Sequence, residues 1–89
     1  MRSEGPEVAV RLVSAPDCHL CVHAHEVLVR LVNEGLPLVV EECAWNQEDG
    51  ERLVCRDGVP FPPALYVDGV LWGYGRISER ALRKRLAQQ

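Results

Sequence analysis

The sequence lacks the features that nucleic-acid binding and membrane insertion require. Its 89 residues carry 10 basic and 13 acidic side chains, a net charge of −3, whereas phosphate binding needs a basic surface. The longest mostly apolar stretch, residues 27–40, is interrupted by polar residues, Gly35 and Pro37, so it provides no membrane span. We therefore expect neither nucleic acid nor a membrane as a partner.

The N-terminus lacks the apolar core of a secretory signal, because residues 1–7 are mostly polar. We therefore expect a cytoplasmic protein, in a compartment that keeps thiols reduced. Four cysteines are too few for a disulfide scaffold, so metal binding, catalysis or burial must explain them. Hydrophobic residues make up 47% and charged residues 26%, as in globular proteins, and the length predicts a single domain over 1–89.

The first half of the chain predicts a strand, a helix and a second strand. Apolar residues alternate over 7–14, and the additional apolar Val13 indicates burial on both faces of that strand. Residues 19–34 have helical spacing and end before Gly35. The apolar face of this helix is predicted to comprise Leu20, Ala24, Val27, Leu28 and Leu31. With a strand over 38–42, the segment is a βαβ unit whose strands are parallel.

The second half predicts a hairpin. A short helix fits 47–55, although Gly50 weakens it. Strands over 64–67 and 70–72 flank Asp68-Gly69, a dipeptide typical of a type I′ turn. Residues 73–75 are interpreted as a flexible corner.

A last helix is predicted over 79–87, with Ser78 as its N-cap. Its inward face should comprise Ala81, Leu82 and Leu86, and we expect Trp72 to pack against it. The predicted order is strand, helix, strand, short helix, two strands and helix.

A Cys-x-x-Cys motif, Cys18-His19-Leu20-Cys21, lies where the first strand gives way to the helix. Cys18 precedes the helix, near unpaired N–H groups that favour a thiolate. Cys21 lies one turn on, so the two can close a disulfide with little rearrangement. In such a pair the outer thiolate attacks a target disulfide, and the inner thiol resolves the mixed disulfide. The position between strand and helix, more than the spacing, favours redox chemistry.

Two other interpretations of these cysteines stay open. Cys18 and Cys21 with nearby histidines would suit Zn²⁺, although no second Cys-x-x-Cys follows. The histidines concerned are His19, His23 and His25. Alternatively, the chain is a binding module without a redox cycle. The remaining cysteines, Cys43 and Cys55, are interpreted as small hydrophobic residues of the structure.

Taken together, these motifs resemble the thioredoxin/glutaredoxin superfamily, and most of all small bacterial glutaredoxin-like proteins with a Cys-His-Leu-Cys active site. Residues 58–65 resemble the approach to that superfamily's cis-proline, with Pro63 in its place. Residues 66–69 resemble the glutaredoxin hairpin, and 73–78 the glycine-containing turn before the last helix. The resemblance implies an α/β thioredoxin fold: a four-stranded mixed sheet, with the strands in the order second, first, third, fourth, and helices on both faces.

The resemblance also implies a function, thiol–disulfide oxidoreduction by a monomer. Cys18 would be the nucleophile and Cys21 the resolving thiol, with no metal and no bound cofactor. The residues implied in substrate binding are Pro62, Pro63, Gly73, Tyr74 and Gly75. Glutathione or a thioredoxin-type reductant would recharge the pair. From the departures described next, we expect protein disulfides as the substrates.

Three departures from the glutaredoxin pattern concern glutathione. Ala15 stands where glutaredoxins usually carry a lysine for the glutathione carboxylate. Trp72 replaces the first glycine of the turn, and Arg76 falls near its aspartate. Pro62, before the cis-proline position, has no N–H to donate to a bound thiol substrate, which removes a hydrogen bond worth roughly 0.5–1.5 kcal/mol. We therefore expect weak or absent use of glutathione.

Overall fold

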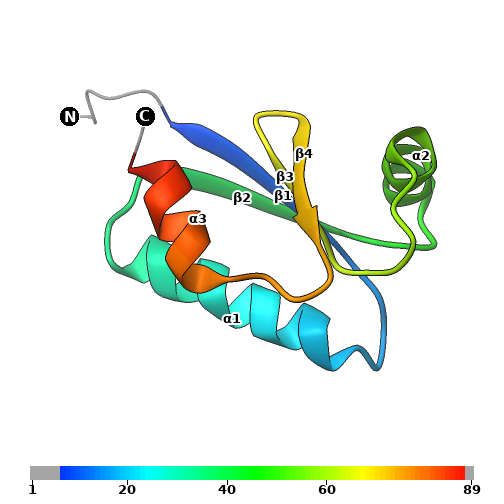
Figure 1. Cartoon of the computed structure of the whole chain (residues 1–89), viewed down its shortest axis with the longest axis horizontal. Helices are drawn as coiled ribbons and strands as arrows, with labels where there is room; N and C mark the ends of the chain where they lie inside the picture. Colours follow the sequence, from blue (N-terminus) through cyan, green and yellow to red (C-terminus); the bar gives the residue numbers. More distant parts are fainter. Residues whose placement is uncertain (1–6, 88–89) are drawn as a thin grey trace.

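The computed structural model describes residues 7–87, within which four strands and three helices follow one another. The elements are β1 (Val8–Ser14), α1 (His19–Asn33), β2 (Leu38–Ala44), α2 (Glu48–Asp57), β3 (Ala64–Val67), β4 (Val70–Tyr74) and α3 (Glu79–Leu86). The strands form one mixed sheet in the order β2-β1-β3-β4, as predicted. Helices α1 and α3 lie together beside the sheet, and α2 lies apart from them (Figure 1).

Strand register determines which loops meet. Strand β1 runs parallel to β2 and antiparallel to β3, and β3 runs antiparallel to β4. Val13 pairs with Ala64, which in turn pairs with Tyr74. One end of the sheet therefore brings together the end of β1, the start of β3 and the end of β4. The loop that enters α1 lies beside this end (Figure 1).

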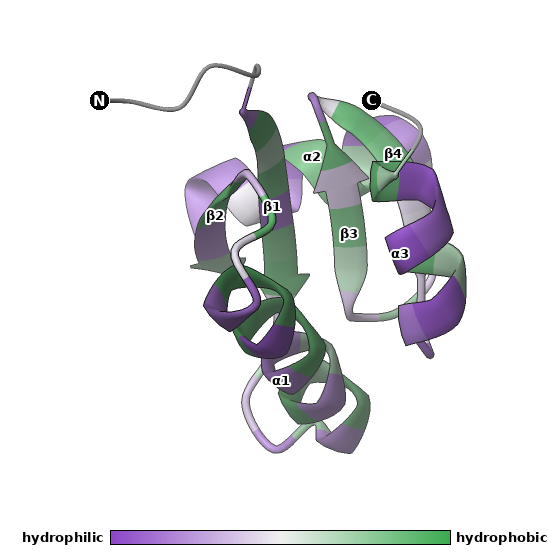
Figure 2. Cartoon of the chain, turned by 90° about the vertical axis from the view of Figure 1, so that its left-hand side faces the viewer, coloured by the Kyte–Doolittle hydropathy of each residue, from purple (hydrophilic) through white to green (hydrophobic). Residues whose placement is uncertain are grey.

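Alternation along the strands divides the core between the two faces of the sheet. Val8, Val10 and Leu12 of β1 pack with buried residues of α1 and α3. Val13 contributes to a second cluster with Ala64, Tyr66 and Val54 of α2. In Figure 2, α2 lies behind the strands, whereas α1 lies below them and α3 to their right. Val13 is fully buried, as the sequence predicted.

The turn residues occupy the conformations that their sequence positions predict. Asp68 and Gly69 have φ of 52° and 82°, the positive values that a type I′ hairpin requires. Ser78 caps α3, its hydroxyl oxygen accepting the N–H of Ala81. Trp72 packs against the cluster that includes Leu82 of α3.

Gly50 does not weaken α2 but permits its packing. The residue is buried, and a Cβ there would collide with the carbonyl oxygen of Ala44. The helix therefore approaches the end of β2 closely and forms over Glu48–Asp57. Packing therefore requires a residue without a side chain at position 50, and helix propensity does not take such a contact into account.

Four other expectations need correction. Gly73 and Tyr74 belong to β4 rather than to a flexible corner, because they pair with Leu65 and Ala64, and only Gly75 turns. Strand β2 continues to Ala44 because its pairing with β1 continues to Ser14. The remaining two expectations concern the inward faces of the helices. Ala81 is exposed, since a residue next to Leu82 points about 100° away on the helix, and Leu20 is only half-buried.

Candidate active site

The side chain of Cys18 caps α1. Its backbone is extended, with φ of −120° and ψ of 106°, and its sulfur accepts the Cys21 N–H at 3.1 Å. The Cys18 carbonyl also accepts the N–H groups of Cys21 and Val22, at 3.1 Å each. The sulfur thus lies among the first N–H groups of the helix, where negative charge is favoured.

Cys18 and Cys21 form a disulfide, with their Cα atoms 5.2 Å apart. The two sulfur-bearing residues differ in access. Cys21 is 4% exposed, whereas Cys18 is half-buried. A partner arriving from solvent therefore meets Cys18 first.

Pro63 lies at the end of the sheet that is next to the entry to α1. The Pro62-Pro63 peptide bond is cis, as predicted, and Pro63 is buried. The Pro63 carbonyl accepts the N–H of Gly75 at 2.8 Å, which joins the start of β3 to the end of β4. Because Val13 pairs with Ala64, Pro63 lies beside the end of β1, from which the chain continues to Cys18.

An exposed aromatic pair stands beside this proline. The rings of Phe61 and Tyr74 meet edge to face, 5.5 Å between centroids, and the residues are 49% and 46% exposed. Gly75 lies against Phe61, since a Cβ there would come 2.9 Å from the ring. The sequence singled out Tyr74 but not Phe61, because no local pattern brings the two residues together.

Solved structures share this fold. The chain superposes on oxidised mitochondrial thioredoxin 3 from Saccharomyces cerevisiae with a TM-score of 0.67 and 20% identity, covering 93% of this chain and 79% of that one. Oxidised thioredoxin O2 from Arabidopsis thaliana gives 0.68 and 17% identity, covering 92% and 74%. The chain has the thioredoxin fold. Thioredoxin f2 from Chlamydomonas reinhardtii gives 0.67 and 14%, covering 91% and 77%. No protein-family model matches the chain, and no curated protein matches it.

On this fold, the chain carries a disulfide between Cys18 and Cys21 at the start of α1. At these identities the likeness establishes the fold. The resemblance drawn from the sequence is therefore confirmed for the fold and the sheet order. The roles of the individual site residues and the use of glutathione stay predictions.

Within residues 7–87, the three histidines do not form a metal-ligand set around the cysteines, although His25 lines a small cavity together with Cys21. His23 Nε2 lies 3.2 Å from the Ile77 carbonyl, whereas His25 Nδ1 lies 2.9 Å from Glu42 Oε1. Among residues 7–87, no group of three or more Cys, His, Asp or Glu side chains is placed to hold a metal ion.

The other cysteines are free thiols. Cys43 is half-buried against the second core cluster, which includes Val13 and Val54, and burial raises the pKa of its thiol. Cys55 is exposed on α2. The interpretation of Cys55 as a small hydrophobic residue is therefore wrong, because its side of the short helix faces solvent.

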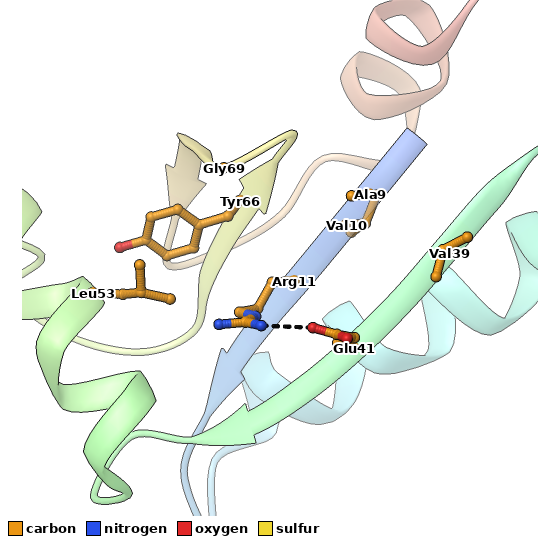
Figure 3. Close-up of a pocket in the computed structure, with 8 residues that line it drawn as sticks. All are labelled: Ala9, Val10, Arg11, Val39, Glu41, Leu53, Tyr66 and Gly69. Carbon is orange, nitrogen blue, oxygen red and sulfur yellow. Dashed lines mark hydrogen bonds and ion pairs between the residues drawn. The ribbon is translucent and has the colours of Figure 1, made fainter. Parts of the chain in front are cut away.

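A cavity of about 350 Å³ lies on the α2 side of the sheet (Figure 3). The ion pair between Arg11 Nη2 and Glu41 Oε1, 2.6 Å apart, lies along it, and Leu53 and Tyr66 also line it. Burial raises the pKa of Tyr66 to about 12, and the negative charge of Asp57 acts in the same direction. None of the predicted site residues lines this cavity.

Within residues 7–87, no helix is both long and apolar enough to cross a bilayer.

Proposed function

We propose that the protein is a thiol–disulfide oxidoreductase whose redox-active pair is Cys18 and Cys21. The observation that carries this proposal is the disulfide between them at the N-terminus of α1, on the thioredoxin fold. In the reduced form, the Cys18 thiolate attacks a substrate disulfide RS–SR′ and releases R′S⁻. Cys21 then attacks Cys18, which closes the intramolecular disulfide and releases RS⁻, so that the protein gives two electrons to the substrate.

Polypeptide disulfides are the proposed substrates. The exposed Phe61–Tyr74 pair provides apolar surface next to Pro63, which suits a polypeptide better than a small thiol. Ala15 offers no charge for a glutathione carboxylate, and Pro62 offers no N–H. These features support weak use of glutathione. In this proposal Pro62, Pro63, Gly73, Tyr74 and Gly75 shape the substrate edge.

The proposed setting is the cytoplasm, where a monomer would be recharged by glutathione or by a thioredoxin-type reductant. The choice of reductant follows from the resemblance alone.

The test is to trap the mixed disulfide. With Cys21→Ser, a disulfide-bonded polypeptide such as insulin should remain attached to Cys18, as a mass adduct that dithiothreitol removes. The matched variant Cys18→Ser should give no adduct at Cys21 and no turnover. Full reductase activity of Cys18→Ser would overturn the assignment. Calorimetry with reduced glutathione tests the substrate preference, which tight and saturable binding would contradict.

A further inference from the structure

A small cavity opens beside the buried cysteine of the pair. It has a volume of about 170 Å³ and lies where the start of α1 meets the ends of β1 and β2. Its lining consists of Ser14, Ala15, Cys21, Val22, His25 and Glu42. Cys21 is thus the member of the pair that lines this cavity.

Two titratable side chains of the cavity are joined to each other. His25 follows Cys21 by four residues, which places both on one side of α1. His25 Nδ1 and Glu42 Oε1 are 2.9 Å apart, and the other Glu42 oxygen accepts the Ser14 hydroxyl at 3.1 Å. An ionised carboxylate only accepts, so Nδ1 donates to Glu42, and in the neutral imidazole Nε2 keeps a lone pair. The cavity therefore holds a base that a carboxylate orients.

The second step of exchange requires such a base. Cys21 must lose its proton before it attacks Cys18, yet it is only 4% exposed. Charging a buried group without a partner is unfavourable, so a proton acceptor near the sulfur speeds the step. The cavity has room for water between sulfur and base, and the exposed His25 connects it to solvent.

The other charged groups around the start of α1 are directed elsewhere. Asp17 and His19 are exposed on the entry to the helix, and neither lines the cavity. His23 contacts the Ile77 carbonyl ahead of α3. Strand β1 contributes Ser14 as its only polar side chain in the lining, and β2 contributes Glu42. His25 is thus the only basic side chain in the lining.

We propose that His25, oriented by Glu42, accepts the proton of Cys21 during resolution and returns it to the released thiolate. This rests on the proposed function. The Cys21–Cys18 disulfide bond forms as the bond between Cys18 and the substrate sulfur breaks. The leaving RS⁻ then takes the proton from the His25 imidazolium, so that RSH departs and His25 is neutral again. Glu42 is a positioning residue, which acts through His25.

The two steps are separable with Ellman's reagent in a stopped-flow instrument. All proteins compared, the wild-type reference included, carry Cys43→Ser and Cys55→Ser, which remove the two other free thiols. Attack by Cys18 then releases one thionitrobenzoate, and resolution by Cys21 releases a second. His25→Gln should leave the first phase unchanged and slow the second about tenfold at pH 7. The effect is smaller than the 10²–10⁴ typical of general bases because water in the cavity still accepts the proton in the variant. The pH profile of the second phase should also change, because the variant has no imidazole to accept the proton.

Rescue and matched variants separate proton transfer from a structural effect. In His25→Ala, added imidazole should restore the second phase. Glu42→Gln should slow the second phase less than His25→Gln does. His23→Gln, on the same helix but outside the cavity lining, should leave its pH profile unchanged. Glu41→Gln, the neighbour of Glu42 that pairs with Arg11, should do the same.

The possible outcomes separate a failure of the role of His25 from a failure of the proposed oxidoreductase activity. Absence of the first phase in the wild-type protein would overturn the proposed oxidoreductase. Two phases in the wild type, with a second phase that His25→Gln leaves unaltered in rate and pH profile, would overturn the role of His25 alone. Equal slowing of both phases without imidazole rescue would also overturn that role, since proton transfer to Cys21 affects resolution only.

Discussion

The sulfur of Cys18 accepts a hydrogen bond from the backbone N–H of Cys21, its own disulfide partner, at 3.1 Å. The first turn of α1 contains no acidic residue that would oppose negative charge there. A thiolate formed at Cys18 on reduction therefore gains both a donor and the positive end of the helix dipole.

This geometry predicts the order in which the reduced cysteines react. At pH 7, iodoacetamide should modify Cys18 several times faster than Cys55, because Cys55 is exposed but lies toward the C-terminal end of α2. Cys21 should react last, since it is buried. Peptide mass spectrometry after timed quenching measures all the rates in one sample. Faster modification of Cys55 than of Cys18 would contradict activation by the helix.

The close approach of α2 to β2 predicts an asymmetry between two glycine substitutions. Gly50→Ala should lower the free energy of unfolding by about 1–3 kcal/mol, the usual effect of overpacking, because its Cβ would collide with the Ala44 carbonyl. The same change at Gly73 should be nearly neutral, since nothing lies within 4 Å of the added atom. Denaturant unfolding of both variants checks this. Equal stability of the two would contradict the described packing.

An ion-pair network between α1 and α3 predicts loss of stability in acid. Arg83 lies 2.7 Å from Glu34 and 2.8 Å from Glu79, and Arg30 lies 3.1 Å from Glu79. Hydrogen bonds from Arg83 lower the pKa of Glu34, and hydrogen bonds from Arg30 and then Arg83 lower the pKa of Glu79. Because both folded pKa values lie below the ordinary 4.5, the stabilisation is present above pH 4.5 and is lost as the pH falls below it.

The measurement is Tm against pH for the wild-type protein and for Glu79→Gln. The variant should show a shallower fall below pH 4.5, and high salt should reduce the difference because these pairs are largely exposed. If the Tm of both proteins fell equally steeply below pH 4.5, Glu79 would contribute nothing to the loss of stability in acid.

Tyr66 predicts a loss of stability at the other end of the pH scale. It is 1% exposed, and burial raises its pKa from 10.0 to about 12. The folded protein holds this proton more tightly than the unfolded chain, so stability is complete below pH 10 and declines between pH 10 and 12. Tyr66→Phe should remove part of that decline, whereas Tyr74→Phe, at an exposed position, should not. Identical alkaline limbs for the two variants would contradict the prediction.

The fold was accessible from sequence wherever local chemistry determines structure. Alternation over 7–14, helical spacing over 19–34 and the Asp68-Gly69 turn predicted their elements to within a few residues. These signals depend on side-chain period and backbone conformation, which neighbouring residues alone determine. The Cys18–Cys21 site was accessible for the same reason, since both cysteines lie within one turn of a strand-to-helix junction.

The rest depends on contacts between distant segments. Gly50 counts against a helix in the sequence because helix propensity contains no term for the Ala44 carbonyl that approaches this residue. Phe61 was missed because its contact with Tyr74 requires the pairing of β3 with β4. The link between His25 and Glu42 likewise requires β2 to lie beside the start of α1. The periodicity and residue spacing of the sequence do not predict these contacts between separate elements.

The central claim is that Cys18 and Cys21 cycle between dithiol and disulfide. The most direct test equilibrates the protein anaerobically across a gradient of thiol and disulfide, traps it by alkylation and weighs it by mass spectrometry. The account predicts one reversible two-electron step at these two residues, with a midpoint between roughly −180 and −270 mV, the range of dithiol exchange proteins. Free thiols or a fixed disulfide across the whole gradient would contradict it.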